Sequence, residues 1–149
     1  MGVFKPLLKL KDKTIIERSI DSMFNADVNQ DIVVLWHRAE EVQVLLRNKY
    51  DSSKLSFIFN NKYSEINMLA SVKISIFKLN TCNPFYILPG DMPVIHPKTF
   101  LAVKEGMGKT NAMIAFPTID GYRKHLPLVS WKCIDYIIKF KVDYFKNRI

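Results

Sequence analysis

The residues best suited to chemistry in this sequence lie in a short loop, Pro-Gly-Asp-Met-Pro, that runs from Pro89 to Pro93. The loop follows an apolar segment directly, and Gly90 permits an unusual backbone, so Asp91 is expected at the carboxyl end of a strand. A carboxylate in that place suits Mg²⁺, which takes one or two carboxylates and completes its shell with phosphate oxygens and water. The alternative is a structural turn in which Asp91 only caps a helix.

Two basic segments could bind the phosphates that such a metal would accompany. Four lysines, at positions 5, 9, 11 and 13, lie close together near the N-terminus, and clustered lysines favour anionic partners. A solvated edge is the alternative interpretation. Arg123, Lys124 and His125 share a polar turn between two strand candidates. There Arg123 can bind a phosphate through two parallel hydrogen bonds and His125 can donate or accept one, although a lone loop histidine is often structural.

A third segment resembles a phosphate-binding loop only in part. Residues 106–110, Gly-Met-Gly-Lys-Thr, have the end of a P-loop, but Val103 stands where its first glycine belongs. We predict a hairpin-like turn there instead.

Alternating helices and strands must position these residues. Helical spacing predicts helices over 14–25, 39–50, 68–79 and 98–105, and Thr14 with Glu17 forms a capping box at the first. Apolar segments predict strands over 31–36, 55–59, 85–88, 112–116 and 126–129. The first strand is expected to be buried on both faces, and Pro127 should restrict the last to a sheet edge.

The order of these elements predicts an α/β fold with a mostly parallel sheet, in which ligands bind at the carboxyl ends of the strands. From Trp131 onward the sequence predicts a terminal helix with one apolar and one basic face. Docking of that helix on the body is the favoured interpretation, and a membrane-surface helix is the alternative.

Composition excludes several classes of protein. The 149 residues are 48% hydrophobic and 24% charged, which is typical of one globular domain. The sequence has no apolar run of membrane-spanning length, and its two cysteines, Cys82 and Cys133, have no metal-binding spacing. We therefore expect a soluble protein in the reducing cytoplasm. The net charge of +8 leaves a basic RNA-binding domain as an alternative, although no known binding module is visible.

Four segments carry a family resemblance when taken in order. Residues 1–8 fit Met-Gly-x-x-Lys-x-Leu-Leu, residues 60–73 resemble Asn-x-x-Tyr…Met-x-x-Ser-Val-Lys, residues 87–94 contain Gly-Asp-Met-Pro, and residues 121–130 resemble Gly-x-Arg-Gly-His-Pro-x-Leu. Together they resemble the molybdenum cofactor nucleotidyltransferases, a MobA-like NTP transferase family, especially its cytidylyltransferase branch. The resemblance implies a three-layer, Rossmann-like fold of the nucleotide-diphospho-sugar transferase type.

The same resemblance implies a reaction and a set of residues. The phosphate of molybdopterin would attack the α-phosphorus of CTP, favoured over GTP, with Mg²⁺ bound. The implied catalytic residues are Lys5 and Asp91, with Asp91 as the metal ligand. The implied nucleotide-binding residues are Lys5, Asn60, Ser71 and Gly90, and Arg123 with His125 would face the pterin phosphate.

The family also has a strand and a phosphate loop, Leu-Ala-Ala-Gly-x-Ser-x-Arg, immediately before the Met-Gly with which this sequence starts. We therefore expect residues 1–149 to be a single domain that is incomplete at both ends, with the central strand missing. The alternative function is an inactive relative that binds an anion or nucleotide or serves as an interaction domain. An open sheet can recruit a second copy, so a homodimer is a further expectation, as are partners in molybdoenzyme maturation.

Overall fold

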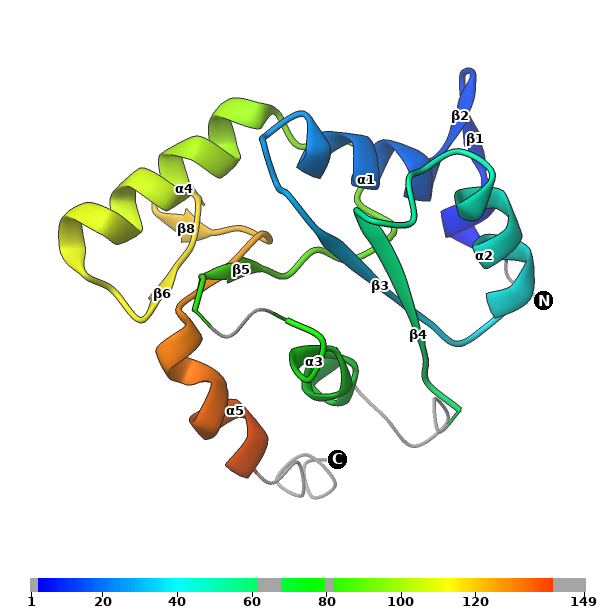
Figure 1. Cartoon of the computed structure of the whole chain (residues 1–149). Coiled ribbons are helices and arrows are strands. Elements are labelled where there is room, and N and C mark those ends of the chain that lie inside the picture. The colour runs from blue at the N-terminus through cyan, green and yellow to red at the C-terminus, as the bar shows by residue number, and fades with distance from the viewer. Residues whose placement is uncertain (1–2, 62–67, 80–81, 141–149) are drawn as a thin grey trace, which may run out of the picture.

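The structure is a computed structural model that describes residues 3–61, 68–79 and 82–140. Its helices are α1 (Ile15–Phe24), α2 (Ala39–Arg47), α3 (Met68–Ile76), α4 (Pro97–Thr110) and α5 (Ile134–Lys139), with 3₁₀ turns η1 (Lys5–Leu7) and η3 (Trp131–Cys133). Its strands are β1 (Lys9–Leu10), β2 (Lys13–Thr14), β3 (Asp31–Leu35), β4 (Leu55–Phe59), β5 (Phe85–Tyr86), β6 (Ile114–Ala115), β7 (Thr118–Ile119), β8 (Tyr122–Arg123) and β9 (Leu128–Val129). Helices lie above and below the longest strands (Figure 1).

Helix α1 begins where the capping box predicts. The Glu17 amide donates to the Thr14 hydroxyl oxygen at 3.4 Å, and a Glu17 carboxylate oxygen accepts from the Thr14 amide at 2.7 Å. Ile16 and Ile20 then face the main core at helical spacing. Local chemistry therefore sets both the start of α1 and the face that it buries.

Strands β3 and β4 form a parallel pair, with Asp31 opposite Leu55 and Leu35 opposite Phe59. The main core packs around this pair and contains Ile16, Ile20, Leu35, Val42, Leu46 and Leu55. Both predicted strands are confirmed, but the prediction that the first is buried on both faces is wrong. All of β3 except Leu35 is half-buried, because β3 is paired along one edge and its other edge lines a cavity.

A second sheet has the order β5-β9-β6, and both of its ladders are antiparallel. The expectation that Pro127 confines the last strand to an edge is wrong, since β9 is the central strand. Pro127 precedes the two-residue ladder, so its missing N–H is not needed there. Its carbonyl instead accepts from the Ile87 amide at 3.1 Å.

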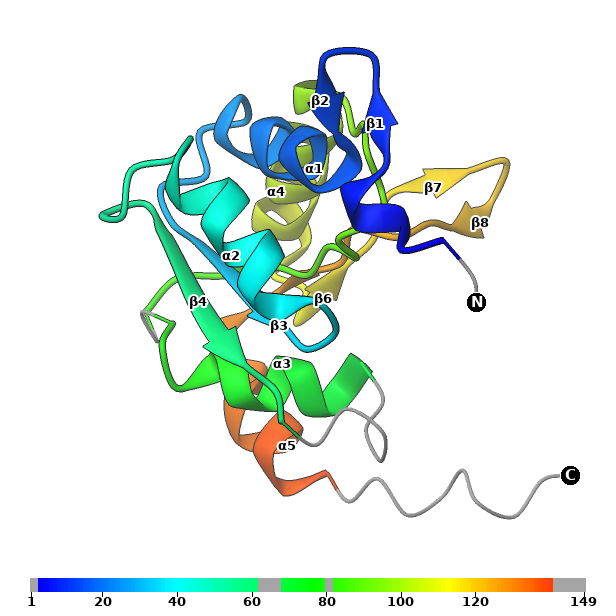
Figure 2. The ribbon, with the colours of Figure 1, turned by 90° about the vertical axis from the view of Figure 1, so that its right-hand side faces the viewer.

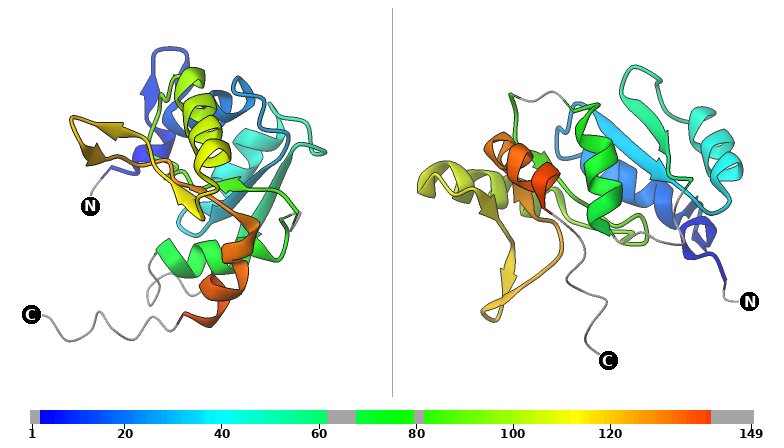
Figure 3. Two further views of the ribbon diagram at one scale, coloured as in Figure 1. Left: turned by 90° about the vertical axis from the view of Figure 1, so that its left-hand side faces the viewer. Right: turned by 90° about the horizontal axis from the view of Figure 1, so that it is seen from below.

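The α/β fold class is confirmed, although the strands form small separate sheets. Within the described residues the β3–β4 pair is parallel, whereas the other ladders are antiparallel. Figures 2 and 3 show α3 and α5 side by side on the face of β3 opposite to α1. The Lys73 ammonium on α3 donates to the Phe140 carbonyl just after α5, which supports docking of the described part of the terminal helix.

Helix α4 is longer than the sequence predicts. It continues through residues 106–110, where a hairpin-like turn was expected, and ends at Asn111 in the left-handed conformation. The helix persists because Phe100, Val103 and Met107 recur on one buried face, which outweighs the low helix propensity of its two glycines. No helix in the described part of the chain is both long and apolar enough to span a membrane.

Candidate functional site

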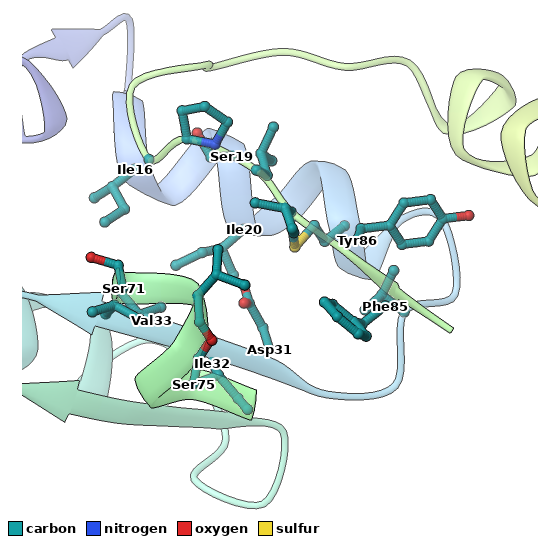
Figure 4. Close-up of a pocket in the computed structure, with 18 of the residues that line it drawn as sticks. Ile16, Ser19, Ile20, Asp31, Ile32, Val33, Ser71, Ser75, Phe85 and Tyr86 are labelled. Carbon is teal, nitrogen blue, oxygen red and sulfur yellow. The ribbon is translucent and has the colours of Figure 1, made fainter. Parts of the chain in front are cut away.

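A cavity of about 1160 Å³ opens beside β3, and its lining includes every residue proposed to bind the nucleotide. Lys5 comes from η1, Ser71 from α3, and Gly90 and Asp91 from the loop after β5. Asn60 follows β4 directly, and its amide donates to the Leu35 carbonyl at 2.7 Å. Segments far apart in the sequence thus meet around one space, as Figure 4 shows for its inner part.

The loop that carries Asp91 is held against α1. The Ser19 hydroxyl donates to the Met92 carbonyl at 2.7 Å, and the Met92 amide donates to the Pro89 carbonyl at 3.2 Å. A Cβ added at Gly90 would lie 3.7 Å from Ile16, so the loop packs closely on the helix. Asp91 itself is exposed. A fixed backbone therefore presents a solvent-accessible carboxylate at the cavity rim.

The opposite rim contains residues that sequence reasoning missed. Trp36 and His37 follow β3 and line the cavity. The His37 ring lies edge-on to the ring of Phe4, with centroids 5.2 Å apart, which ties η1 to the carboxyl end of β3. The rule that ligands bind at strand ends pointed to the loop after Trp36 without singling out His37.

Asp31 lies at the amino end of β3, on the inner wall of the cavity (Figure 4). Desolvation there disfavours the charged carboxylate and raises the pKa of Asp31 to about 6, despite an opposing hydrogen bond from the Ile32 amide. The carboxyl of Asp31 is therefore poorly solvated, unlike the exposed carboxylate of Asp91.

Arg123 and His125 lie apart from this cavity, near the β7–β8 hairpin. Asp120 and Gly121 form the hairpin turn with positive φ of 52° and 78°, which is the conformation that Asp-Gly favours between paired strands. Arg123 stacks on the Phe116 ring at 5.3 Å, and His125 lines a second cavity of about 670 Å³.

The second cavity has a basic lining that includes His96, Lys98, Lys124 and His125. The two cavities share the Asp91 loop, since Gly90 and Asp91 line the first and Met92 lines the second. The predicted site residues thus fall into two groups. The proposed nucleotide-binding residues line the first cavity and His125 lines the second, with the Asp91 loop contributing to both.

The lysine cluster is divided as well. Lys5 lines the first cavity, while Lys9, Lys11 and Lys13 belong to the β1–β2 hairpin. The Lys13 ammonium is 2.7 Å from the Asp21 carboxylate. Lys9 and Lys11 are exposed, so the solvated-edge interpretation describes them better than an anion site does.

The donor set at Asp91 suits a hard divalent cation that brings most of its own ligands. No group of three or more His, Cys, Asp or Glu side chains able to hold a metal occurs among the described residues. One exposed carboxylate that lines an open cavity suits Mg²⁺, which keeps waters and phosphate oxygens in its shell.

The chain is similar in sequence to known proteins. A profile of the family described as "MobA-like NTP transferase domain" matches residues 1–148. The probable molybdenum cofactor guanylyltransferase of Natranaerobius thermophilus is 28% identical over 141 residues, which cover 93% of this chain and 64% of the relative. The chain therefore spans less than two thirds of that protein's length.

Two solved structures have a similar fold. Rv0371c from Mycobacterium tuberculosis, solved in complex with manganese, superposes with a TM-score of 0.75 at 18% identity, covering 95% of this chain and 73% of that one. A nucleotidyl transferase from Methanothermobacter thermautotroptrophicus has a TM-score of 0.57 at 28% identity, covering 69% of this chain and 45% of that one.

Proposed function

Since the chain belongs to the MobA-like NTP transferase family, we propose that it binds a nucleoside triphosphate at the rim of the larger cavity and transfers the nucleotidyl group to a phosphate. In this proposal residues 1–149 act as one domain, in the cytoplasm, with molybdopterin as the acceptor. The observation that carries the proposal is the convergence of Lys5, Asn60, Ser71, Gly90 and Asp91 on one cavity.

The chemistry needs alignment and charge neutralisation more than covalent help. An acceptor phosphate oxygen attacks the α-phosphorus, the bond to the β-phosphate oxygen breaks, and pyrophosphate leaves. The Lys5 ammonium would bind the triphosphate, and Asp91 would hold Mg²⁺. When bound, the metal polarises the phosphoryl oxygens and orients the phosphates. Asn60 and Ser71 would bind the nucleotide, and Gly90 leaves room for its close approach.

The acceptor would bind on the other side of the Asp91 loop. The basic lining of the second cavity, including His125, suits a phosphate monoester. Arg123 lies on the neighbouring hairpin and would add a bidentate contact to the same phosphate. Donor and acceptor would then approach each other across Asp91, which is the arrangement that in-line transfer requires.

The most detailed part of the proposal is the identity of the nucleotide base. The Lys-x-Leu-Leu, Ser-Val-Lys and His-x-Pro-Leu features favour CTP, whereas the relative named a guanylyltransferase favours GTP. Calorimetric titration with CTP, GTP and ATP, with and without Mg²⁺, distinguishes the two. Mn²⁺ belongs in the same series because the neighbouring structure of Rv0371c was solved with that ion.

Asp91→Asn tests the metal assignment. We expect nucleotide binding that strengthens with Mg²⁺ in the unsubstituted chain and loses that dependence in the variant. Asp120→Asn is the matched control, because it makes the same charge change at an exposed hairpin position whose left-handed backbone asparagine tolerates. Unchanged metal dependence in Asp91→Asn would refute the assignment. Nucleotide binding without pyrophosphate release in the presence of acceptor would favour the inactive relative.

A further inference from the structure

Strand β4 is the outer member of the parallel pair that it forms with β3. Its five residues pair with β3 along one side. Among the residues that the structure describes, no ladder occupies the other side of β4, and Figure 2 shows no strand there. We call this side the β4 edge. An edge of this kind presents main-chain donors and acceptors that can pair with another chain.

The hydrogen bonds to β3 show which main-chain groups face the β4 edge. The Asp31 amide donates to the Lys54 carbonyl at 2.8 Å, so the main chain at position 54 faces β3. Because main-chain groups of successive strand residues point to opposite sides, the even-numbered residues of β4 also face β3. The main-chain groups of Leu55, Phe57 and Phe59 therefore face the β4 edge.

Two of these groups already have partners. The Leu55 amide donates to the Asp51 carbonyl at 3.0 Å, and the Phe57 carbonyl accepts from the Lys78 ammonium at 3.0 Å. A lysine at a sheet edge opposes pairing with an ordinary strand, because pairing displaces its hydrogen bond. Within the described part of the chain the amides of Phe57 and Phe59 have no acceptor. These two donors can therefore pair with an incoming chain.

Exposed cations flank the β4 edge. Lys78 reaches it from just beyond α3, and the Arg47 guanidinium at the end of α2 lies 5.8 Å from the centre of the Phe57 ring. Lys54 directly precedes β4. All three cations are exposed, and none forms a salt bridge with a described residue. The turn before β4 supplies one carboxylate, that of Asp51, so the surroundings of the edge are positively charged.

We propose that the β4 edge is a docking site for an acidic, extended segment of a partner protein, which adds to β3 and β4 as a third strand. A carboxylate of that segment would bind the Lys78 ammonium, which leaves the Phe57 carbonyl free to accept from a main-chain amide of the incoming strand. The Phe57 and Phe59 amides would donate to its carbonyls.

Charge selects this occupant over two others. A neutral strand has no carboxylate to bind Lys78, so the ammonium continues to compete for the Phe57 carbonyl. A second copy of this chain that paired through the same edge would bring its own cations against Arg47, Lys54 and Lys78, and like charges repel. An acidic strand instead gains ion pairs and main-chain hydrogen bonds together.

The direct test is binding of the synthetic peptide Glu-Glu-Val-Glu-Glu, acetylated and amidated at its ends, to the full chain. Its carboxylates lie on both faces of an extended strand. The control peptide Gln-Gln-Val-Gln-Gln has the same length and nearly the same shape. We expect saturable binding of the glutamate peptide, slower amide exchange at Phe57 and Phe59, and about tenfold weaker binding of the glutamine peptide at low salt. Equal binding of the two peptides would overturn the proposal.

Methylation of single peptide amides separates strand addition from ionic attraction alone. It removes one main-chain donor and leaves every charge in place. Because successive amides of a strand point to opposite sides, only one of two glutamate peptides, methylated at the second or at the third residue, loses an amide that faces β4. We expect that peptide to bind about tenfold more weakly than the other. Equal binding of the two methylated peptides would mean ionic contact alone and would overturn the proposal.

A substitution in the chain tests the role of Lys78. Lys78→Met keeps an unbranched side chain and removes the charge, while Lys9→Met makes the same change at an exposed position of the β1–β2 hairpin. We expect the preference for the glutamate peptide over the glutamine peptide to fall about threefold in Lys78→Met and to stay the same in Lys9→Met. An unchanged preference in Lys78→Met would contradict the proposal. The paired peptides keep it testable even if Lys78→Met fails to fold.

A second copy of the chain would give a different result. Slow amide exchange at Phe57 and Phe59 in a dimer without peptide would assign the β4 edge to another copy and would overturn the proposal. The proposal does not rest on nucleotidyl transfer, since Arg47, Phe57 and Lys78 do not line the larger cavity. Peptide binding requires neither Mg²⁺ nor nucleotide, so the two proposals succeed or fail separately.

Discussion

Replacing Asp31 by asparagine should stabilise the protein at neutral pH. The carboxyl lies on the inner wall of the larger cavity, where burial raises its pKa to about 6 from 3.8. Because the folded pKa lies above the unfolded one, the folded state holds the proton more tightly. The stability that the protonated carboxyl contributes is fully present below about pH 3.8 and is lost as the pH rises through about 6.

The size of the effect follows from the shift in pKa. The difference between 6 and 3.8 is 2.2, and each unit corresponds to about 1.36 kcal/mol, so ionised Asp31 costs at most about 3 kcal/mol at pH 7.5. Asparagine has nearly the same shape and carries no charge at any pH. The variant should therefore exceed the unsubstituted chain in stability by up to about 3 kcal/mol at pH 7.5.

Urea denaturation between pH 4 and 8 measures this difference. The gain in unfolding free energy should grow with pH and level off above about pH 7, while Asp120→Asn, in the exposed hairpin turn, should follow the unsubstituted chain. A difference between Asp31→Asn and the unsubstituted chain that stays constant within about 0.5 kcal/mol from pH 4.5 to 7.5 would refute the reasoning. It would mean that water reaches the carboxyl.

Other perturbations test the capping of α1, the second core and the rival RNA-binding function. Thr14→Ala removes the hydroxyl that caps α1 and contacts buried Glu17, so urea denaturation should show a loss of about 1–2 kcal/mol. Phe100→Ala empties a fully buried site against Tyr86, and the same assay should show a loss of about 3–5 kcal/mol. RNA binding would weaken steeply between low and moderate salt and would not depend on Mg²⁺. We expect instead nucleotide binding that depends on Mg²⁺. Titrations at two salt concentrations, with and without Mg²⁺, distinguish the two.

Signals within a short stretch of sequence correctly predicted the elements that form without regard to which elements pack beside them. The capping box located the start of α1, and apolar runs located β3 and β4 at or within one residue of their ends. The wrong predictions have a common cause, since each depends on which element packs beside the segment in the fold. The sequence around Pro127 does not show that β9 lies between two other strands. The glycines near position 106 look like a turn until the buried face of α4 is known.

The candidate site was predictable to a similar degree. Motif resemblance and the strand-end rule selected Lys5 and Asp91, which do line one cavity. Neither could show that His125 would line a second cavity, because that cavity is built from residues of three segments, 92–106, 115–119 and 124–125, that only the fold brings together. Nor could they show the raised pKa of Asp31, which comes from burial on the inner wall of the larger cavity.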